Sequence, residues 1–151
     1  MSCAIARVPW VLLIAFAAGF ALAADAPDIG QIKVAKGRVS IERNGQTLAG
    51  EVGARLQPAD VLKTGADGSV GVTMSDNSLL SVGPNSVLAL DKYEFDATTS
   101  QGQFDASLQK GSLAVISGRM AKQSPEAMKV RTPSSILGIR GTEFVISAND
   151  D

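Results

Sequence analysis

The sequence predicts an all-β fold: a stack of short antiparallel strands, solenoid-like and twisted or sandwich-like, after an N-terminal signal helix. Three observations predict it. Polar and apolar residues alternate with a period of two from Gln31 onward, as in strands with one wet face. Turn sequences such as Asn44-Gly45 recur between these runs, and Asn-Gly is a strong hairpin signal. No segment of the mature region carries a sustained apolar stripe at helical spacing.

The expected strands follow one another at short intervals. They cover residues 31–34, 38–42, 60–63, 69–74, 78–82, 86–90, 103–108, 112–116, 128–131, 135–139 and 142–147. A turn at Lys110-Gly111 is expected to separate the strands over 103–108 and 112–116. Only residues 49–56 favour a short helix, whereas residues 118–126 are polar, contain Pro125 and are expected to form a loop.

A weak internal similarity links two parts of the chain. Residues 37–41, which lead to Thr64, resemble residues 111–116, which lead to Thr132, at an offset of about 70 residues. Two interpretations stay open: strands that stack in layers, or chance similarity between β-rich segments.

The first 23 residues are predicted to be a secretory signal. Arg7 precedes an uncharged apolar run over residues 8–24, which ends in the small-x-small pattern Ala21-Leu22-Ala23. This pattern predicts export to the bacterial periplasm with cleavage between Ala23 and Ala24. The alternative is an uncleaved anchor, but the run of 17 residues is shorter than the ~20 of a typical membrane span. Residues 24–30 then form a lead-in linker, 31–148 one β domain and 149–151 a tail.

Composition excludes several classes of function. Lys and Arg number 14 against 15 Asp and Glu, without a basic block, so neither nucleic acid nor an anionic membrane surface is an expected partner. The chain has no histidine, and its single cysteine is Cys3, inside the predicted signal. Thiol catalysis and zinc–thiolate sites are therefore not expected. We expect a non-enzymatic protein without a metal or cofactor, and a mature form without a membrane span.

Three segments resemble motifs of the FecR domain family: residues 64–72, 76–86 and 130–144. The last of these, here called the closing motif, is the most specific. It combines Arg131-Thr132-Pro133 with Arg140-Gly141-Thr142-x-Phe144 at a fixed separation. The resemblance spans residues 34–146. One departure is Asn77, where the family usually has Gly, but Asn also tolerates the left-handed backbone.

The resemblance implies a domain like the periplasmic part of regulators that control sigma factors during iron uptake. Here a signal peptide stands where such regulators carry a cytoplasmic segment and a membrane helix, so we expect a stand-alone periplasmic protein. Its expected function is protein interaction in envelope sensing or signal transduction, with an unidentified inner-membrane sensor or outer-membrane protein as partner. The alternative is a structural module of an envelope assembly. The sequence assigns no oligomeric state.

The motif residues are expected to serve the fold more than a binding site, with the glycines supplying positive φ or close backbone approach. Arg131 and Arg140 are expected to pair with acidic neighbours or with carbonyls. Tyr93 and Phe95 are candidate partner contacts, with the alternative that both cover the core. The motif positions are Thr64, Gly65, Asp76, Ser78, Gly83, Gly111, Arg131, Thr132, Pro133, Gly138, Arg140, Gly141, Thr142 and Phe144.

Overall fold

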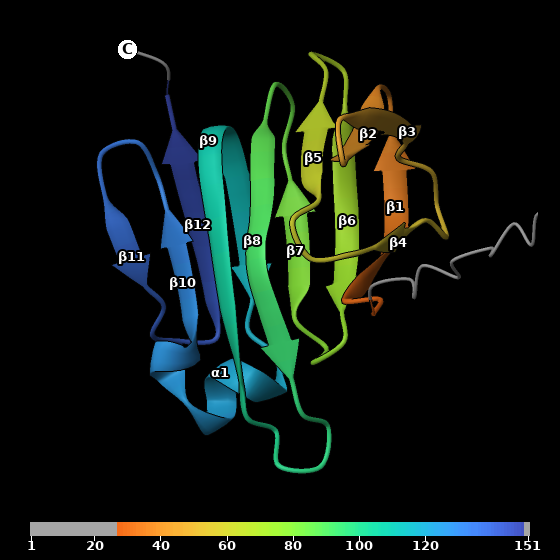
Figure 1. Cartoon of the computed structure of the whole chain (residues 1–151). Coiled ribbons are helices and arrows are strands. Elements are labelled where there is room, and N and C mark those ends of the chain that lie inside the picture. Colours follow the sequence, from red (N-terminus) through yellow and green to blue (C-terminus); the bar gives the residue numbers. More distant parts are fainter. Residues whose placement is uncertain (1–26, 150–151) are drawn as a thin grey trace, which may run out of the picture.

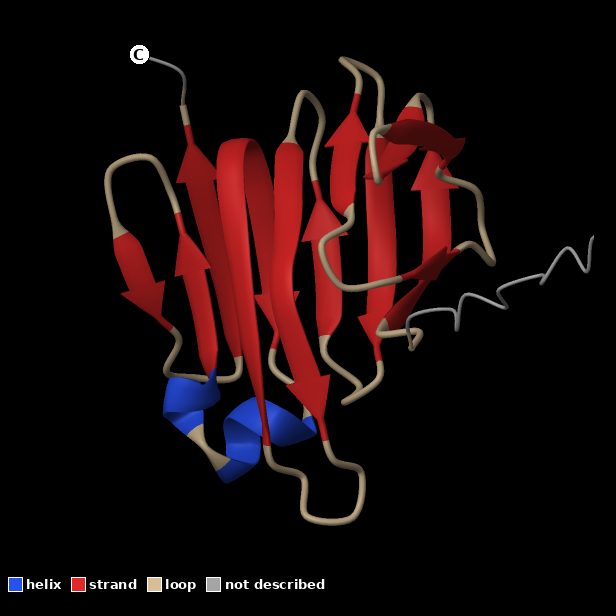
Figure 2. Ribbon diagram, viewed as in Figure 1, coloured by secondary structure: helices blue, strands red, loops and turns tan. Residues whose placement is uncertain are grey.

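The computed structural model describes residues 27–149, so the predicted signal segment lies outside the described residues. These residues form one twelve-stranded sheet with very little helix (Figure 2). The strands are β1 (Gly30–Lys36), β2 (Val39–Arg43), β3 (Gln46–Ala49), β4 (Arg55–Leu56), β5 (Val61–Thr64), β6 (Ser69–Met74), β7 (Leu79–Val82), β8 (Val87–Phe95), β9 (Gly102–Ile116), β10 (Met128–Arg131), β11 (Ile136–Gly138) and β12 (Glu143–Ala148). Between β9 and β10 lie the helix α1 (Arg119–Gln123) and the 3-10 turn η1 (Pro125–Ala127).

The sheet curls on itself because its longest strand belongs to both of its halves. The first part of β9 pairs with β8 and β10, and the second part pairs with β7 and β12. Figure 1 shows β9 folding over at one end of the molecule. We call β3-β2-β5-β8-β9-β10-β11 the front half and β4-β1-β6-β7-β9-β12 the back half. Together they form a curled half-barrel.

One hydrophobic core fills the space inside the curl. Alternate residues of each strand point inward, as the period-two pattern predicts. On the back half, β6 shows this most clearly, because Val70, Val72 and Met74 are buried while the residues between them are partly exposed. The front half contributes Phe104 and Leu108 from β9, both almost fully buried. Burial of these apolar side chains is the main stabilising term of the fold.

The predicted all-β class with antiparallel pairing is confirmed. The finer arrangement is the curled half-barrel, and the one parallel pair among the described strands joins β9 to β10. The residues between these two strands form α1 and η1, which cross the end of the half-barrel (Figure 1). A parallel pair needs such a crossover because its second strand must start again at the same end.

Three local predictions were wrong. Residues 103–108 and 112–116 are one continuous strand, because Gly111 bends the backbone without ending the pairing. Residues 49–56, predicted as a short helix, contain the end of β3, a turn and β4, because residues 54 to 56 bond to β1 and its lead-in. Residues 118–126, predicted as a loop, contain α1, whose first turn bonds to a distant loop around Asp76.

Four of the crossings between the two halves lie at one end of the molecule, here called the crossover end (Figure 1). They are β1 to β2, β5 to β6, β7 to β8, and the bend of β9, whereas α1 leads from β9 to β10 at the opposite end. Backbone bonds connect them in sequence. The Gly65 N–H donates to the Arg38 carbonyl at 2.9 Å, the Asn85 N–H to the Gly65 carbonyl at 3.0 Å, and the Gly83 N–H to the Ser112 carbonyl at 3.0 Å. These bonds satisfy the backbone groups that the crossings would otherwise leave unpaired.

Gly111 is required at the bend of β9 for two reasons. Its φ of 91° lies in the region that L side chains rarely adopt. A β-carbon there would also lie 1.9 Å from the Ser86 hydroxyl oxygen. That oxygen accepts a hydrogen bond from the Ser112 N–H at 3.0 Å, so displacing it would leave this backbone donor without its partner.

The change Gly111→Ala therefore destabilises the protein more than backbone strain alone would. Gly53 is a matched control, since its φ is 93° but a β-carbon would meet nothing within 4 Å. We expect Gly53→Ala to cost about 1 kcal/mol of unfolding free energy. Gly111→Ala should cost about 2 kcal/mol more, through the clash and the lost hydrogen bond. Urea unfolding followed by circular dichroism measures both, and equal losses would show that Ser86 is not constrained by the bend.

Candidate functional site: the closing motif and the Asp76 turn

Four of the motif residues predicted from sequence gather at the crossover end and serve the fold. Besides Gly65 and Gly111, these are Thr64 and Gly83. The Thr64 hydroxyl donates to the Gly83 carbonyl at 2.6 Å and accepts from the Ser86 N–H at 3.0 Å. Thr64 and Ser86 are both buried. The first motif therefore fastens the β5–β6 crossing to the β7–β8 crossing.

A second group of motif residues builds a buried polar turn at the opposite end. Asp76 and Ser78 are both 0% exposed. The Asp76 carboxylate accepts from the Ser78 N–H at 3.1 Å and from the Ser78 hydroxyl at 2.8 Å. The Ser78 hydroxyl oxygen in turn accepts from the Gly118 N–H at 2.9 Å, and the Asp76 carbonyl accepts from the Arg119 N–H at 2.8 Å. The second motif therefore holds the start of α1 against the end of the sheet.

Tyr93 completes this turn from the facing strand β8. Its hydroxyl donates to the Asp76 carboxylate at 3.2 Å and accepts from the Asp76 N–H at 3.0 Å. Its ring packs edge-on against Phe104, with the ring centroids 5.5 Å apart. Burial raises the pKa of Tyr93 well above its usual value of 10.0, and the Asp76 carboxylate raises it further. Both effects disfavour a second negative charge at this place.

The proposed partner contacts at Tyr93 and Phe95 separate in the structure. Tyr93 is only 7% exposed and belongs to the core. The alternative interpretation, that it covers the core, is therefore the correct one, and its assignment as a partner contact is corrected. Phe95 is partly buried, and the Arg119 guanidinium lies 5.6 Å from the centre of its ring. Arg119 also donates to the Ala97 carbonyl at 2.9 Å. Phe95 and Arg119 thus attach the β8–β9 loop to α1.

The closing motif forms a hairpin on the margin of the front half. Arg131 ends β10, and Ile136 starts β11 directly opposite it. The turn between them is closed by Thr132, whose N–H donates to the Ser135 carbonyl at 2.8 Å and whose hydroxyl accepts from the Ser135 N–H at 3.1 Å. Pro133 stands exposed at the tip. β11 pairs only with β10 among the described strands, so its other edge is open.

The second part of the closing motif leads into β12. Gly141 has a φ of 120°, and its carbonyl accepts from the Ser117 hydroxyl at 3.0 Å. The Thr142 carbonyl accepts from the Ser117 N–H at 2.7 Å. Phe144 is partly buried and packs against the core. Gly141, Thr142 and Phe144 therefore serve the fold, because their contacts hold the start of β12 against the end of β9.

The rest of the closing motif has no such explanation. Gly138 was predicted to allow close approach or a positive φ, but a β-carbon there would meet nothing within 4 Å and no positive φ occurs. Arg131 and Arg140 were predicted to pair with carboxylates or carbonyls. Both are exposed, and within residues 27–149 neither guanidinium has a hydrogen bond or an ion pair. These three predictions are corrected, and the two arginines are available to solvent.

Two exposed apolar side chains accompany these arginines, and the sequence analysis did not single them out. Ile136 is 67% exposed and Leu137 is 39% exposed. On the β9 side of Arg131 is an open hollow of about 280 Å³, lined by Ser107, Leu108, Gln109, Arg131, Thr132 and Pro133. The available signal was the run Ile136-Leu137, which breaks the apolar–polar alternation just after a turn. We call Arg131, Pro133 and Ile136 the closing-motif surface. Leu137 pairs with the buried Val130 and therefore lies on the other face of the hairpin.

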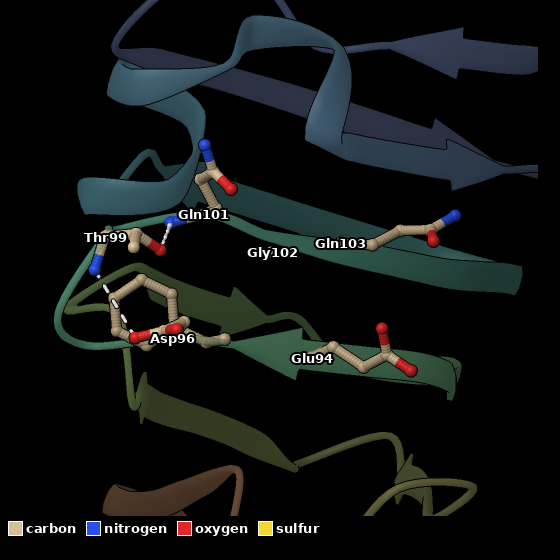
Figure 3. Close-up of a pocket in the computed structure, with 7 residues that line it drawn as sticks. Glu94, Asp96, Thr99, Gln101, Gly102 and Gln103 are labelled. Carbon is tan, nitrogen blue, oxygen red and sulfur yellow. Dashed lines mark hydrogen bonds between the residues drawn. The ribbon is translucent and has the colours of Figure 1, made fainter.

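Another open hollow lies at the β8–β9 loop, with a volume of about 600 Å³. Figure 3 shows the Glu94 and Asp96 side chains apart from one another along it. The Asp96 carboxylate is hydrogen-bonded within the loop, since it accepts from the Thr98 N–H at 2.8 Å. Thr99 likewise accepts from the Gln101 N–H at 3.3 Å. The polar groups therefore stabilise the loop and do not converge on one point.

Two further features are absent from residues 27–149, a metal-binding cluster and a membrane-spanning helix. No group of three or more His, Cys, Asp or Glu side chains there is arranged to hold a metal ion. No helix within the same residues has the length and apolar character needed to cross a bilayer.

The fold and the site together define an all-β domain whose most specific sequence motif forms an edge hairpin. The family model described as FecR protein matches residues 60–151, which is more than half of the chain. The chain therefore belongs to the FecR family, a family of envelope sensing and signal transduction. The match begins at the start of β5, after β1 to β4. Searches of curated proteins and of solved structures found no match.

The Tyr93–Asp76 contact makes stability depend on pH in the alkaline range. Below pH 10 Tyr93 is neutral in both the folded and the unfolded chain, so its contribution to the unfolding free energy is fully present. As the pH rises above 10, the unfolded chain releases the phenol proton and the folded chain keeps it. The unfolding free energy therefore falls, by up to about 1.4 kcal/mol per pH unit from this group, until the folded-state pKa is reached.

Urea unfolding at several pH values between 8 and 12, on the parent and on Tyr93→Phe, measures this contribution. Tyr93→Phe should be less stable at neutral pH by about 1–2 kcal/mol and should lose less stability above pH 10. The chain has one tyrosine, so tyrosinate absorbance reports Tyr93 alone. Ionisation of the folded protein near pH 10 would contradict the buried contact.

Proposed function

We propose that this chain is a non-catalytic protein-interaction module, exported to the bacterial periplasm, which takes part in envelope sensing by binding a protein partner. Its membership of the FecR family supports this role. The absence of histidine from the whole chain and the position of its one cysteine at Cys3 agree with a binding role. The partner in this proposal is an inner-membrane sensor or an outer-membrane protein.

The observation that carries the proposal is the exposure of the closing motif. Motif residues that serve only the fold are expected to touch the rest of the domain, as Thr64, Asp76 and Ser78 do. Arg131 and Ile136 instead face solvent side by side on adjacent strands. Exposed arginine and large apolar side chains are the residue types that contribute most to protein interfaces.

The geometry of the hairpin favours one mode of binding. The free edge of β11 offers backbone groups to an extended segment of the partner, which would add a strand to the front half. Ile136 on the outer face and Leu137 on the inner face would then be covered by successive apolar side chains of the partner strand. The Arg131 guanidinium, which lines the adjacent hollow, would pair with a carboxylate of the partner at the rim. The partner segment is thus expected to be extended, apolar and acidic.

Crosslinking in living cells tests this proposal. A C-terminally tagged full chain is crosslinked in its own host, and the adducts are identified by mass spectrometry, once for the parent and once for Ile136→Asp. An aspartate at this position should repel an acidic partner and remove apolar contact, so the adduct should fall at least tenfold. Ile136 is exposed, so the unfolding free energy should change by no more than about 0.5 kcal/mol.

Val52→Asp is the matched control, because Val52 is 63% exposed and lies between β3 and β4. It should leave the adduct unchanged. Equal adducts from both variants would show that the closing-motif surface does not bind the partner. An adduct of constant stoichiometry in every growth condition would favour a structural role in an envelope assembly over sensing. The mass of the tagged chain also shows whether residues 1–23 are removed.

A further inference from the structure

The outer faces of the two halves differ in charge. On the front half, charged side chains continue across the strands, as in the row in which Lys92 and Lys129 flank Asp105. On the back half, β6, β7 and the second part of β9 carry no charged outward residue. Their outward positions are Ser69, Gly71, Thr73, Leu79, Ser81, Ser112, Ala114 and Ile116. This surface, three strands wide, therefore lacks the charged side chains by which an exposed sheet face usually resists association.

Exposed apolar side chains gather on this face. Eight large apolar side chains of the described residues are exposed, and four of them lie here: Val34, Leu79, Ile116 and Val145. The ladders place them in two rows. One row runs Val34, Gly71, Ser81, Ala114, Val145, and the next runs Gln31, Thr73, Leu79, Ile116, Glu143. We call these two rows the apolar outer face.

The margins of this face carry opposite charges. Glu143 stands at the β12 margin, at one end of the second row. Gln31 stands at the other end of the row, on β1, and the Lys33 amine donates to its side-chain oxygen at 2.5 Å. Lys33 is therefore on the same side of the sheet as the apolar outer face. Beyond Gln31 is Arg55 of the short strand β4, which forms an ion pair with Asp28 at 3.0 Å. The face thus has an acidic margin and a basic margin, with five strands from one to the other.

We propose that two copies of this chain associate through the apolar outer face, about a twofold axis parallel to β7. Such an axis reverses the order of the strands, so each row faces its own reversed copy. Val145 then meets Val34 of the second copy, and Ala114 meets Gly71. Glu143 meets Gln31 and Lys33 of the second copy. The arrangement covers the apolar side chains and pairs the two margins by charge.

The size of the face predicts a weak dimer. Five strands about 4.8 Å apart and about 20 Å long cover roughly 480 Å² per copy. Two such faces bury about 1,000 Å² in total, which is typical of weak or transient complexes. Sheets can pack face to face in this way about 10 Å apart. The dimer is therefore expected to be weak, and it uses a different surface from the closing motif.

A cysteine crosslink tests the geometry. Val34 and Val145 stand four strand spacings apart in one copy, about 19 Å. Across the proposed interface they face each other at about the 10 Å sheet spacing, which is beyond the limit of about 7 Å for a disulfide but within reach of a bis-maleimide with a two-carbon spacer. The full, C-terminally tagged chain carries Cys3→Ser in every sample. Treated with this bis-maleimide, the double variant with Val34→Cys and Val145→Cys should give a covalent dimer. Each single variant should stay monomeric in non-reducing electrophoresis, because Val34 faces Val145 and not itself.

Sedimentation over a range of concentrations tests the charge pairing. Glu143→Lys alone and Lys33→Glu alone should each weaken the dimer at least threefold, and the double variant should restore it. Ser81→Arg, at the centre of the face, should abolish the dimer. Gln109→Arg, equally exposed on the front part of β9, should not. The proposal would be overturned if the parent chain sedimented as a monomer at every concentration. It would also be overturned if the dimer persisted in Ser81→Arg and the cysteine pair did not crosslink. Ile136→Asp should leave the dimer intact, so the two proposals fail separately.

Discussion

The fold depends on the hydrogen bonding of β9. This strand pairs with β8 and β10 before its bend and with β7 and β12 after it. No other described strand has four partners. The positions of the other strands therefore depend on their pairing with β9. A change of register in β9 would shift both halves at once. Gly111 makes this possible, because it bends the strand while the bonds on either side continue.

Two polar clusters close the ends of the half-barrel and keep its halves together. At the crossover end the contacts are between turns, through Thr64, Ser86 and backbone groups. At the other end a single buried carboxylate, Asp76, joins a turn, a strand and a helix. A buried carboxylate is costly unless it is fully hydrogen-bonded, so this turn, α1 and Tyr93 must form together. The closing-motif surface belongs to neither cluster.

Much of the fold could be predicted from the sequence, because an apolar–polar alternation with a period of two shows both where a strand lies and which of its side chains face the core. β6 has the predicted bounds of Ser69 and Met74. What failed depended on distant partners. The helix α1 is five residues long and has no sequence signal, since its start is bonded to Asp76, more than 40 residues away. The burial of Tyr93 likewise depends on Phe104 and Asp76. Motif residues with packing roles were predictable, whereas the exposure of Arg131 and Ile136 was not, because no local pattern shows that β11 is an edge strand.

The position of β9 in the chain has a consequence for how the protein reaches its folded state. A ribosome or a secretion pore delivers β1 to β8 first, and these strands can form two separate ladders, β2-β5-β8 and β1-β6-β7. Until β9 emerges, the strands β7 and β8 each end in an open edge with no partner. Open edges of this kind recruit other chains. Pairing with other chains is therefore easiest before β9 has emerged, a period of exposure that the stability of the finished molecule does not reveal.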